Sequence, residues 1–415
     1  MINQSESVNQ EPKKVDDRFA IFYFLWMGGA STIAWAAVVN SFDYFDKTFP
    51  GRDVSFVFPN APYVANLATT LVITQLSNKY SYNARILFSM CIITAMTLFV
   101  PIEAKMFQNI DFGMNLIMVA LFVMGFNNTI CYASTAGLCS QIDGKYTGFF
   151  LIGVAIFGLV MNFVKEGVLL VLDPVDDSDL ESILWYFGIT TLFLVIAFIL
   201  HFIFIRSEFY HVKVKLQIYA NDILSVTERD TETALLGDSQ KPKRPQRDLK
   251  TLFEVGKAAW LYLFILVVCC TQQNIPYPGV MLKKVIPGME NHTKTVSMVT
   301  TFSLFYIFGK RIGQYRHIYT AKTTIIVTLF RFLLVGLFFI QVLDGTLPVI
   351  KTAWFAYFNI ALFGITQGFL NVSLFILGPE TVEGNKKEVA GFLAVFAINF
   401  GQMLGGFLAL PFKNI

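Results

Sequence analysis

The chain has 415 residues, of which 55% are hydrophobic and 15% are charged. Soluble domains average roughly 45–50% apolar and about 25% charged residues, and here the apolar residues come in long blocks, which indicates a membrane protein. The formal net charge is only +3, and the basic residues lie in short stretches between the apolar blocks, which excludes a continuous nucleic-acid-binding face.

The first 18 residues are polar and include Glu11, Asp16 and Asp17. A cleavable signal peptide begins with a basic stretch followed by a short apolar one, so we expect residues 1–18 to be a cytosolic tail. The five cysteines fall inside or beside apolar segments, and none has metal-ligand spacing with a histidine. We therefore expect neither a disulfide framework nor a metal site.

Eleven apolar stretches are long enough to cross a bilayer, which takes roughly 20 residues of helix. The sequence therefore predicts an all-α membrane protein with eleven transmembrane helices. The expected spans are 19–45, 54–77, 84–107, 112–139, 146–172, 181–205, 251–275, 295–313, 320–343, 351–378 and 387–411. The eighth of these is the weakest prediction.

The only long hydrophilic insertion, residues 206–250, divides the spans into six and five. Its scattered charges, serines and threonines are typical of a flexible linker. We predict an N-terminal bundle at 19–207, a cytosolic linker at 208–250 and a C-terminal bundle at 251–415. Two bundles joined in this way favour a major-facilitator-like transporter, in which one bundle rocks against the other around a midplane site.

Lysine and arginine residues predict the orientation of the spans. With the N-terminus in the cytosol, 21 of them lie on the inside and eight on the opposite side, as the positive-inside rule requires. The C-terminus is then non-cytosolic, and the sequon at Asn291 predicts N-glycosylation outside. We expect the plasma membrane, with an endolysosomal or other internal membrane as the alternative, because residues 231–236 approach a dileucine sorting signal.

Aromatic and amide side chains in the first and fourth spans are candidates for substrate contacts. Trp35 lies in the middle of the first span, where its ring can stack on a planar base, although tryptophan also packs between helices. Asn128 and Tyr132 are four residues apart and share a helix face. Such a polar face binds a solute or holds helices together, and both interpretations stay open.

Charged residues inside spans cost about 2.5 kcal/mol or more and normally face a polar interior or a partner. Arg331, near the centre of the ninth span, is either a substrate-pathway residue or part of a structural ion pair. Asn162 and Lys165 share a face of the fifth span, and Asp43 ends the first. These three are candidates for gating or coupling, or else polar residues near the outer surface.

Prolines predict breaks in the second and seventh spans, at Pro59, Pro62, Pro276 and Pro278. Such breaks are tolerated where they line a cavity or form a hinge. The sequence contains no glycine-rich phosphate loop, no HExxH motif and no nucleophile elbow, so we expect no enzymatic activity.

Several local patterns resemble one transporter family. Trp35 is followed by Tyr44-Phe45, and Ala36 stands where the family usually has asparagine. Further matches are Tyr146-Thr147 with Gly153 and Gly158, Asn162 and Lys165, Pro278-Gly279, Arg331, Gln367-Gly368-Phe369, and Glu388-Val389-Ala390-Gly391. Together with the six-plus-five plan, these motifs resemble the equilibrative nucleoside transporter family.

The eighth span departs from the family pattern. Residues 302–310 are similar to the family's Phe-Asn-x-x-Asp-x-x-Gly-Arg signature, but Tyr306 replaces the aspartate and Lys310 the arginine. In the family this acid and base contact the sugar hydroxyls and the base. A tyrosine does not supply a carboxylate's charge at neutral pH, which leads to the hypothesis of a ligand with fewer sugar contacts or a different polar solute.

The resemblance implies facilitative transport of nucleosides or nucleobases by alternating access. It implies no cofactor, a small-molecule substrate, surrounding membrane lipids and no obligatory protein partner. The expected substrate-binding residues are Trp35, Asn128, Tyr132, Tyr306, Lys310 and Arg331, and the expected gating or coupling residues are Asp43, Asn162, Lys165 and Gln367. Proton coupling through Asp43, Glu166 or His201 stays open.

A second hypothesis comes from the change at Tyr306. A chain that lost its acidic ligand contact can also be a non-transporting membrane subunit that kept the fold. Uptake of labelled nucleosides and nucleobases separates the two.

Overall fold

The computed structural model describes residues 16–106, 110–172, 179–215, 249–281, 291–343, 352–383 and 386–414, and within these ranges it contains helices and no strands. Nine helical stretches of the described residues are long and apolar enough to cross a membrane. They are Arg18–Val39, Tyr82–Glu103, Asp111–Cys139, Gly144–Leu172, Leu180–Arg206, Lys250–Asn274, Ala321–Leu343, Ala353–Glu380 and Val389–Phe412.

The first predicted span is broken into three short helices. These are α1 (Arg18–Ala30), α2 (Ile33–Val39) and α3 (Phe42–Thr48). At the second break the Ser41 hydroxyl donates to the backbone oxygen of Ala37 at 2.9 Å, since serine side chains offer the backbone an alternative to the helical ladder. The expected span 19–45 therefore contains two breaks, and its part Arg18–Val39 is long and apolar enough to cross a membrane.

Prolines lie at the two predicted breaks. Pro59 separates α4 (Val54–Val57) from α5 (Asn60–Lys79), and α11 (Leu249–Asn274) stops before the π-helix η2 (Pro276–Val280). Proline lacks a backbone N–H, so it is favoured beside a helix end or in a first turn. The breaks at Pro59 and Pro276 are confirmed, whereas Pro62 lies in the first turn of α5 and Pro278 lies inside η2.

The remaining long helices follow the predicted spans to within a few residues, since long apolar runs are helical in lipid. They are α6 (Tyr82–Met106), α7 (Ile110–Ile142), α8 (Gly144–Leu172), α9 (Asp179–Arg206), α13 (Asn291–Ile312), α14 (Ala321–Leu343), α16 (Ala353–Glu380) and α17 (Lys386–Ala409). Two short elements follow α9 and α17, namely the π-helix η1 (Tyr210–Lys215) and the 3-10 helix η3 (Leu410–Asn414).

Two boundaries differ from the prediction. The linker expected at 208–250 begins with the helix η1, in which Tyr210 and Val214 are buried; residues 216–248 lie outside the described residues. The helix α13 begins at Asn291, so the sequon occupies its first turn and not a preceding loop. Both differences arise because apolar or helix-compatible residues extend beyond the strictly hydrophobic window.

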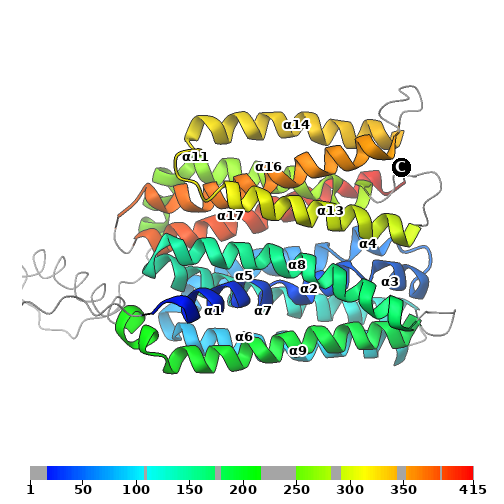
Figure 1. The fold of residues 1–415 in the computed structure, drawn as a ribbon, viewed down its shortest axis with the longest axis horizontal. Coiled ribbons are helices and arrows are strands. Elements are labelled where there is room, and N and C mark those ends of the chain that lie inside the picture. The colour runs from blue at the N-terminus through cyan, green and yellow to red at the C-terminus, as the bar shows by residue number, and fades with distance from the viewer. Residues whose placement is uncertain are drawn as a thin grey trace, which may run out of the picture.

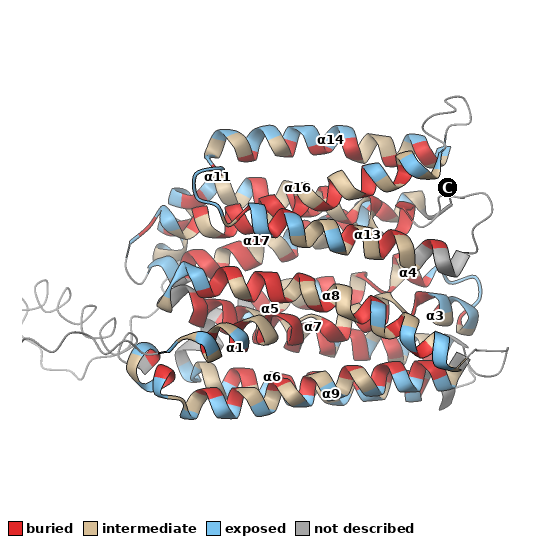
Figure 2. Cartoon of the chain, viewed as in Figure 1, coloured by how far each residue is buried: buried red, intermediate tan, exposed pale blue. Residues whose placement is uncertain are grey.

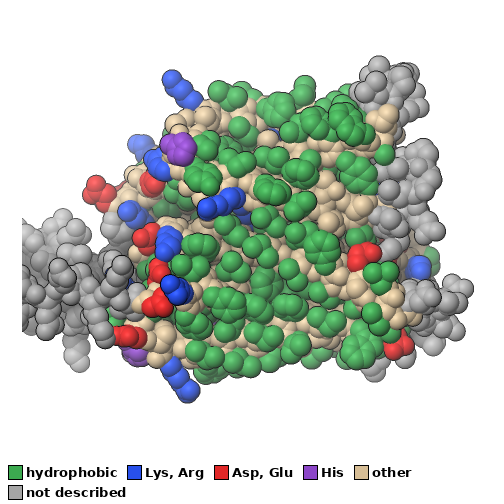
Figure 3. All heavy atoms as spheres, viewed as in Figure 1, with side chains coloured by type: hydrophobic (Ala, Val, Ile, Leu, Met, Phe, Trp, Pro, Cys, Tyr) green, Lys and Arg blue, Asp and Glu red, His purple; other side chains and the backbone are tan. Residues whose placement is uncertain are grey.

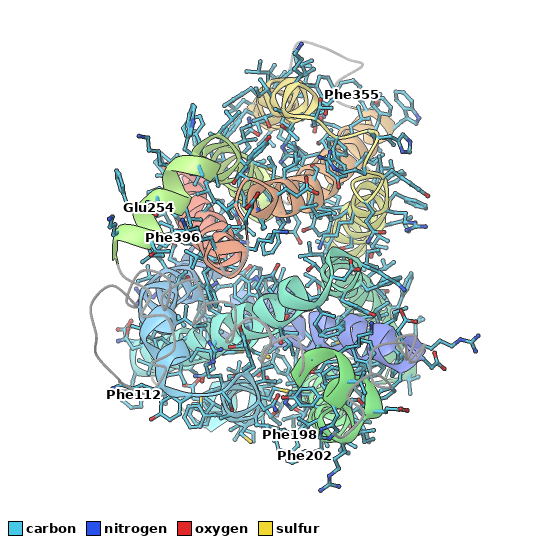
Figure 4. The ribbon with its side chains drawn as sticks, turned by 90° about the vertical axis from the view of Figure 1, so that its left-hand side faces the viewer. Phe112, Phe198, Phe202, Glu254, Phe355 and Phe396 are labelled. Carbon is cyan, nitrogen blue, oxygen red and sulfur yellow. The ribbon has the colours of Figure 1, made fainter. Side chains whose placement is uncertain are left out.

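The helices form two groups that lie side by side (Figure 1). One holds α1 to α9 and the other α11 to α17. Viewed along the helices, the groups occupy the lower and upper parts of the molecule, with Phe198 and Phe202 at the outer edge of one and Phe355 at the outer edge of the other (Figure 4). Across the boundary, α5 and α7 pack against α17, and α8 packs against α13.

Burial and polarity follow the requirements of a bilayer. Buried residues gather where the two groups meet, and exposed ones lie on outer helices such as α9 and α14 (Figure 2). Hydrophobic side chains cover most of the visible face, and lysine and arginine gather at the end where α1 begins (Figure 3). A broad apolar belt with charged ends is the surface that lipid selects.

Glycines allow one very close helix crossing in each group. A Cβ atom on Gly153 of α8 would collide with the backbone oxygen of Leu25 in α1, and one on Gly368 of α16 would collide with that of Tyr306 in α13. Small residues let backbones approach in this way in membrane helices. The crossings fix α1 against α8 and α13 against α16.

Candidate substrate site

A cavity of about 160 Å³ lies between the two helix groups. Its walls come from helices in both, at positions near the middle of long helices such as α7 and α17. It is lined by Ser31, Thr32, Trp35, Pro62, Tyr63, Asn66, Gly125, Asn128, Thr129, Tyr132, Val154, Tyr306, Lys310, Asn371, Val395, Ile398, Asn399 and Gln402. A polar cavity at this depth and between two bundles is where alternating-access transporters bind their substrates.

Aromatic rings form one wall of the cavity. Trp35 on α2 meets Tyr63 on α5 edge-on, with ring centroids 6.2 Å apart, and Tyr132 on α7 meets Phe150 on α8 at 5.0 Å. Edge-to-face pairs hold rings in defined orientations. The structure thus brings Trp35 and Tyr132, both expected at the site, to one cavity.

Asn128 lines the same cavity as Tyr132, as their spacing of four residues on α7 predicts. Its side chain forms no hydrogen bond with any residue that the structure describes, and its Oδ1 is buried. Buried polar groups are nearly always hydrogen-bonded. Since this oxygen has almost no accessible surface, it lies in the wall of the cavity, and other atoms of Asn128 form the lining.

Tyr306 and Lys310 come from one face of α13. The Tyr306 hydroxyl accepts a hydrogen bond from Asn371 Nδ2 at 2.6 Å, and the Lys310 ammonium lies 4.3 Å from the centre of the Tyr306 ring. Lys310 also donates to the backbone oxygen of Leu151 in α8, at 2.6 Å. This single buried side chain therefore joins the two helix groups at the cavity wall.

None of the described residues that line the cavity is acidic, and Lys310 is the charged one among them. Its positive charge interacts with a carbonyl dipole and an aromatic face, both of which attract cations. An uncharged or negatively charged ligand is compatible with this electrostatic environment, whereas a cationic ligand is repelled.

Further polar lining residues were not expected from the sequence. They are Asn66 on α5, Asn371 on α16, and Asn399 and Gln402 on α17. Asn399 Nδ2 donates to Thr70 Oγ1 at 3.0 Å, which links the two groups. No motif in the sequence distinguished Asn371 on α16 or Asn66 on α5 from polar residues that pack between helices.

Arg331 does not line the cavity. It is fully buried on α14, donates to Phe363 O at 3.0 Å and to Thr366 Oγ1 at 2.9 Å, and lies 4.1 Å from the centre of the Phe363 ring. Its Nε also donates to Gln272 Oε1 at 3.3 Å. Arg331 thus holds α11, α14 and α16 together, and its expected direct substrate contact stays a prediction.

Gln367 also lies away from the cavity lining. It is fully buried on α16, and its Oε1 accepts a hydrogen bond from Cys269 Sγ at 3.2 Å. Like Arg331, it contacts other helices of its own group. Gln367 has no direct contact with the cavity, and its expected gating or coupling role stays a prediction.

Asn162 lies at another contact between the groups, towards the end of the molecule opposite the start of α1. Its Oδ1 accepts from Asn40 Nδ2 at 2.8 Å and its Nδ2 donates to Thr300 Oγ1 on α13 at 3.4 Å. Lys165 is buried one turn further along α8, with its ammonium 5.6 Å from the Tyr186 ring centre. Asp43 is exposed on α3.

His201 lies near the end of α9 and contacts α1. It is fully buried, and its Nδ1 lies 2.6 Å from the Tyr23 hydroxyl on α1. It lies outside the cavity lining. An apolar run does not reveal which helix face another helix covers, so the sequence did not show this contact.

The arrangement of helices matches solved transporters. The structure of the proton:xylose symporter of the major facilitator superfamily aligns over 94% of this chain and 88% of that one, with a TM-score of 0.65 and 11% identity. The fucose:proton symporter of E. coli aligns over 95% and 90%, with a TM-score of 0.59 and 13% identity. The chain therefore has the fold of these two symporters, with helices in two groups and apolar helices long enough to cross a membrane.

Sequence comparison gives the family. The model of the family described as nucleoside transporter matches residues 117–414, and the chain belongs to this family. Equilibrative nucleotide transporter 1 of Arabidopsis thaliana is 19% identical over 99% of this chain and 89% of its own length. Equilibrative nucleotide transporter 8 of the same plant is 20% identical over 98% of each chain. Human equilibrative nucleoside transporter 4 is 19% identical over 95% of this chain and 83% of its own.

Proposed function

We propose that the chain carries nucleosides, nucleobases or both across a membrane by facilitative alternating access. The observation that carries this proposal is the midplane cavity between two helix groups, lined by Trp35, Asn128, Tyr132, Tyr306 and Lys310. An aromatic wall suits a planar base, and the amide and hydroxyl groups supply hydrogen bonds. The family membership and the names of the relatives support the same substrate class.

Contacts between the groups on either side of the cavity serve as the two gates. Lys310 to Leu151 O closes the end where α8 begins, and Asn162 to Thr300 closes the opposite end. A neutral hydrogen bond contributes about 0.5–1.5 kcal/mol net and a charged one about 1.5–3 kcal/mol. Each gate is therefore weak enough to open while the other stays closed, with Asp43 and Lys165 beside the second gate.

The proposal includes a topology of eleven spans in a six-plus-five arrangement. Besides the nine apolar helical stretches, α5 and α13 are long enough to cross, because 20 and 22 residues of helix span about 30 Å. Both lie at the contact between the groups, where polar residues are tolerated. The N-terminus is then cytosolic, the C-terminus and Asn291 are on the other side, and the plasma membrane is the expected location.

Uptake into vesicles tests the proposal. The full-length protein is reconstituted and the entry of labelled adenosine, inosine and uracil is measured without an ion gradient. We expect saturable uptake of at least one solute that stops at equal concentrations, and acceleration when unlabelled solute is preloaded. Correctly folded protein that carries none of the three would contradict the proposal and favour a non-transporting subunit.

A further inference from the structure

A second hollow lies on the outer surface of the molecule, where α1 packs against α9. Its volume is about 550 Å³, which lies within the range of roughly 300–1,000 Å³ of known ligand pockets. Figure 4 shows two of its residues, Phe198 and Phe202, on the side of their helix group that faces away from the other group. This α1–α9 groove is lined by Phe19, Phe198, Ile199, Phe202, Ile203, Arg206 and Ser207.

The α9 residues of the groove form one stripe along the helix. Positions 198, 202 and 206 are four residues apart, as are 199 and 203, and such spacings lie on one helix face. Phe198 and Arg206 are eight residues apart, which is about 12 Å along an α-helix. The hydrocarbon layer of one leaflet is about half of 30 Å thick. The groove therefore follows most of the depth of one leaflet.

The walls of the groove are apolar and open to the surroundings. The exposed fractions of Ile199, Phe202 and Ile203 are 52%, 38% and 50%. Phe198 and Phe202 hold each other edge-on, with ring centroids 5.0 Å apart. The neighbouring molecules at this depth are lipids, and an acyl chain fills an apolar groove by van der Waals packing.

A basic residue lies at one end of this apolar groove. Arg206 is the last residue of α9, is exposed, and forms no hydrogen bond or ion pair within the part of the chain that the structure describes. Glu208 is the one acid between Arg206 and Lys213, so this stretch has a net positive charge. A guanidinium binds the two oxygens of a phosphate with parallel hydrogen bonds.

The acids at the start of α1 do not cancel this charge. Lys145 donates to the Asp17 carboxylate at 2.7 Å, and Asp16 lies 4.0 Å from Arg18. Lysine and arginine side chains gather at this end of the molecule (Figure 3). The end of the groove at Arg206 is therefore suited to a negatively charged group.

We propose that the α1–α9 groove binds an anionic phospholipid, with its phosphate at Arg206 and one acyl chain along the α9 stripe beside Phe19. Basic pockets between membrane helices bind anionic headgroups in this way. In the proposed topology this end faces the cytosol, whose leaflet carries the anionic lipids. The inference goes beyond the transport function, because it does not depend on the solute that is carried.

The experiment titrates the full-length protein in a neutral detergent with dioleoyl phosphatidylserine or dioleoyl phosphatidylcholine, and counts the bound lipid by native mass spectrometry. We expect phosphatidylserine to bind about fivefold more tightly, the factor that corresponds to about 1 kcal/mol for one basic residue near a membrane surface. Arg206→Gln should abolish the preference. Lys257→Gln, at an exposed position of α11 outside the groove, should keep it.

A second pair of variants tests the apolar part of the groove. Ile203→Trp places a larger side chain in it and should weaken phosphatidylserine binding by about tenfold, since losing two buried methylene groups of the chain costs about that factor. Ile326→Trp, at a 64% exposed position of α14, is the matched control and should bind as the unaltered protein does. Soluble glycerophosphoserine, which has the same headgroup and no chains, should not compete.

Each result supports or overturns the inference. Equal affinity of the unaltered protein for the two lipids would overturn it, and so would a preference that persists in Arg206→Gln. Unchanged binding in Ile203→Trp, or competition by glycerophosphoserine, would show that surface charge alone holds the headgroup and would also overturn it. Arg206 and Ile203 are exposed, so both variants should unfold at the temperature of the unaltered protein when lipid is absent. Absence of nucleoside uptake would contradict the proposed function and leave this inference standing.

Discussion

Lys310 is a buried cation whose described contacts are a carbonyl oxygen and an aromatic ring. Buried charges normally pair with an opposite charge or bind a ligand. The Lys310 ammonium lines the cavity, so its N–H groups can exchange Leu151 O for an acceptor atom of a bound solute. Binding at Lys310 would then weaken the contact that closes one end, which couples occupancy of the site to its opening.

The variant Lys310→Met tests this role, because methionine preserves most of the length and removes the charge and the donors. We expect the initial uptake rate per folded molecule to fall by about tenfold or more, since a charged hydrogen bond contributes about 1.5–3 kcal/mol. Lys322→Met, at an exposed position of α14, is the control. An unaltered rate in Lys310→Met would show that neither the charge nor the contact matters.

Arg331 shows that the sequence can identify a buried charge but not the groups that surround it. The sequence correctly marks it as an expensive buried charge, but the cost is met by polar groups on α11 and α16 and by the ring of Phe363. The same physical rule applies to Lys310, which faces the cavity. One-dimensional information cannot tell these two cases apart, because the difference lies in which neighbouring helix each face meets.

At the scale of elements, the apolar runs predicted the helices well. The expected span 146–172 is α8 at Gly144–Leu172, because a backbone in lipid must satisfy its own hydrogen bonds. The breaks around α2 were not predicted, since no proline marks them. Asn66 was missed for a different reason: α5 is less apolar, and its polar residues show no periodic face that separates cavity from lipid.

Close helix crossings give a sharp prediction for α8. Gly153→Ala should lower the thermal stability by several degrees, because its Cβ would collide with Leu25 O and overpacking costs about 1–3 kcal/mol. Gly158→Ala, on the same helix with nothing within 4 Å of the new atom, should be neutral or stabilising, as alanine favours helix. Thermal unfolding of both variants in one detergent makes the comparison. Equal stabilities would show that α1 does not approach α8 this closely.

At the scale of the whole molecule, transport by alternating access requires the two helix groups to separate at each end in turn. Gly148 on α8 and Gln314, just after α13, lie in contact at the end where α1 begins: a Cβ on Gly148 would be 3.7 Å from Gln314 Cγ. The Cγ position is the one that a cysteine's Sγ takes, so two cysteines at these positions bring their side chains close together. A disulfide between them, formed once their Cβ atoms lie about 3.5–4.5 Å apart, holds this end closed.

The double variant Gly148→Cys/Gln314→Cys should lose nearly all uptake on oxidation and regain it on reduction. It is best made with Cys91→Ser, since Cys91 is exposed and the other four cysteines are buried. Each single variant, oxidised in parallel, should keep its rate. Full uptake by protein that is demonstrably cross-linked would mean that this end does not open during transport.

Trp35 lies on α2, a helix of only seven residues with a turn at each end. Side-chain and loop motions take picoseconds to microseconds, whereas whole bundles need microseconds to milliseconds. We expect the indole to close over an arriving ring well before the bundles respond, so that capture and translocation become separate kinetic steps. Time-resolved fluorescence of a variant that keeps Trp35 as its single tryptophan should then resolve two phases. Only the slower phase should disappear when the two helix groups are cross-linked by the disulfide described above.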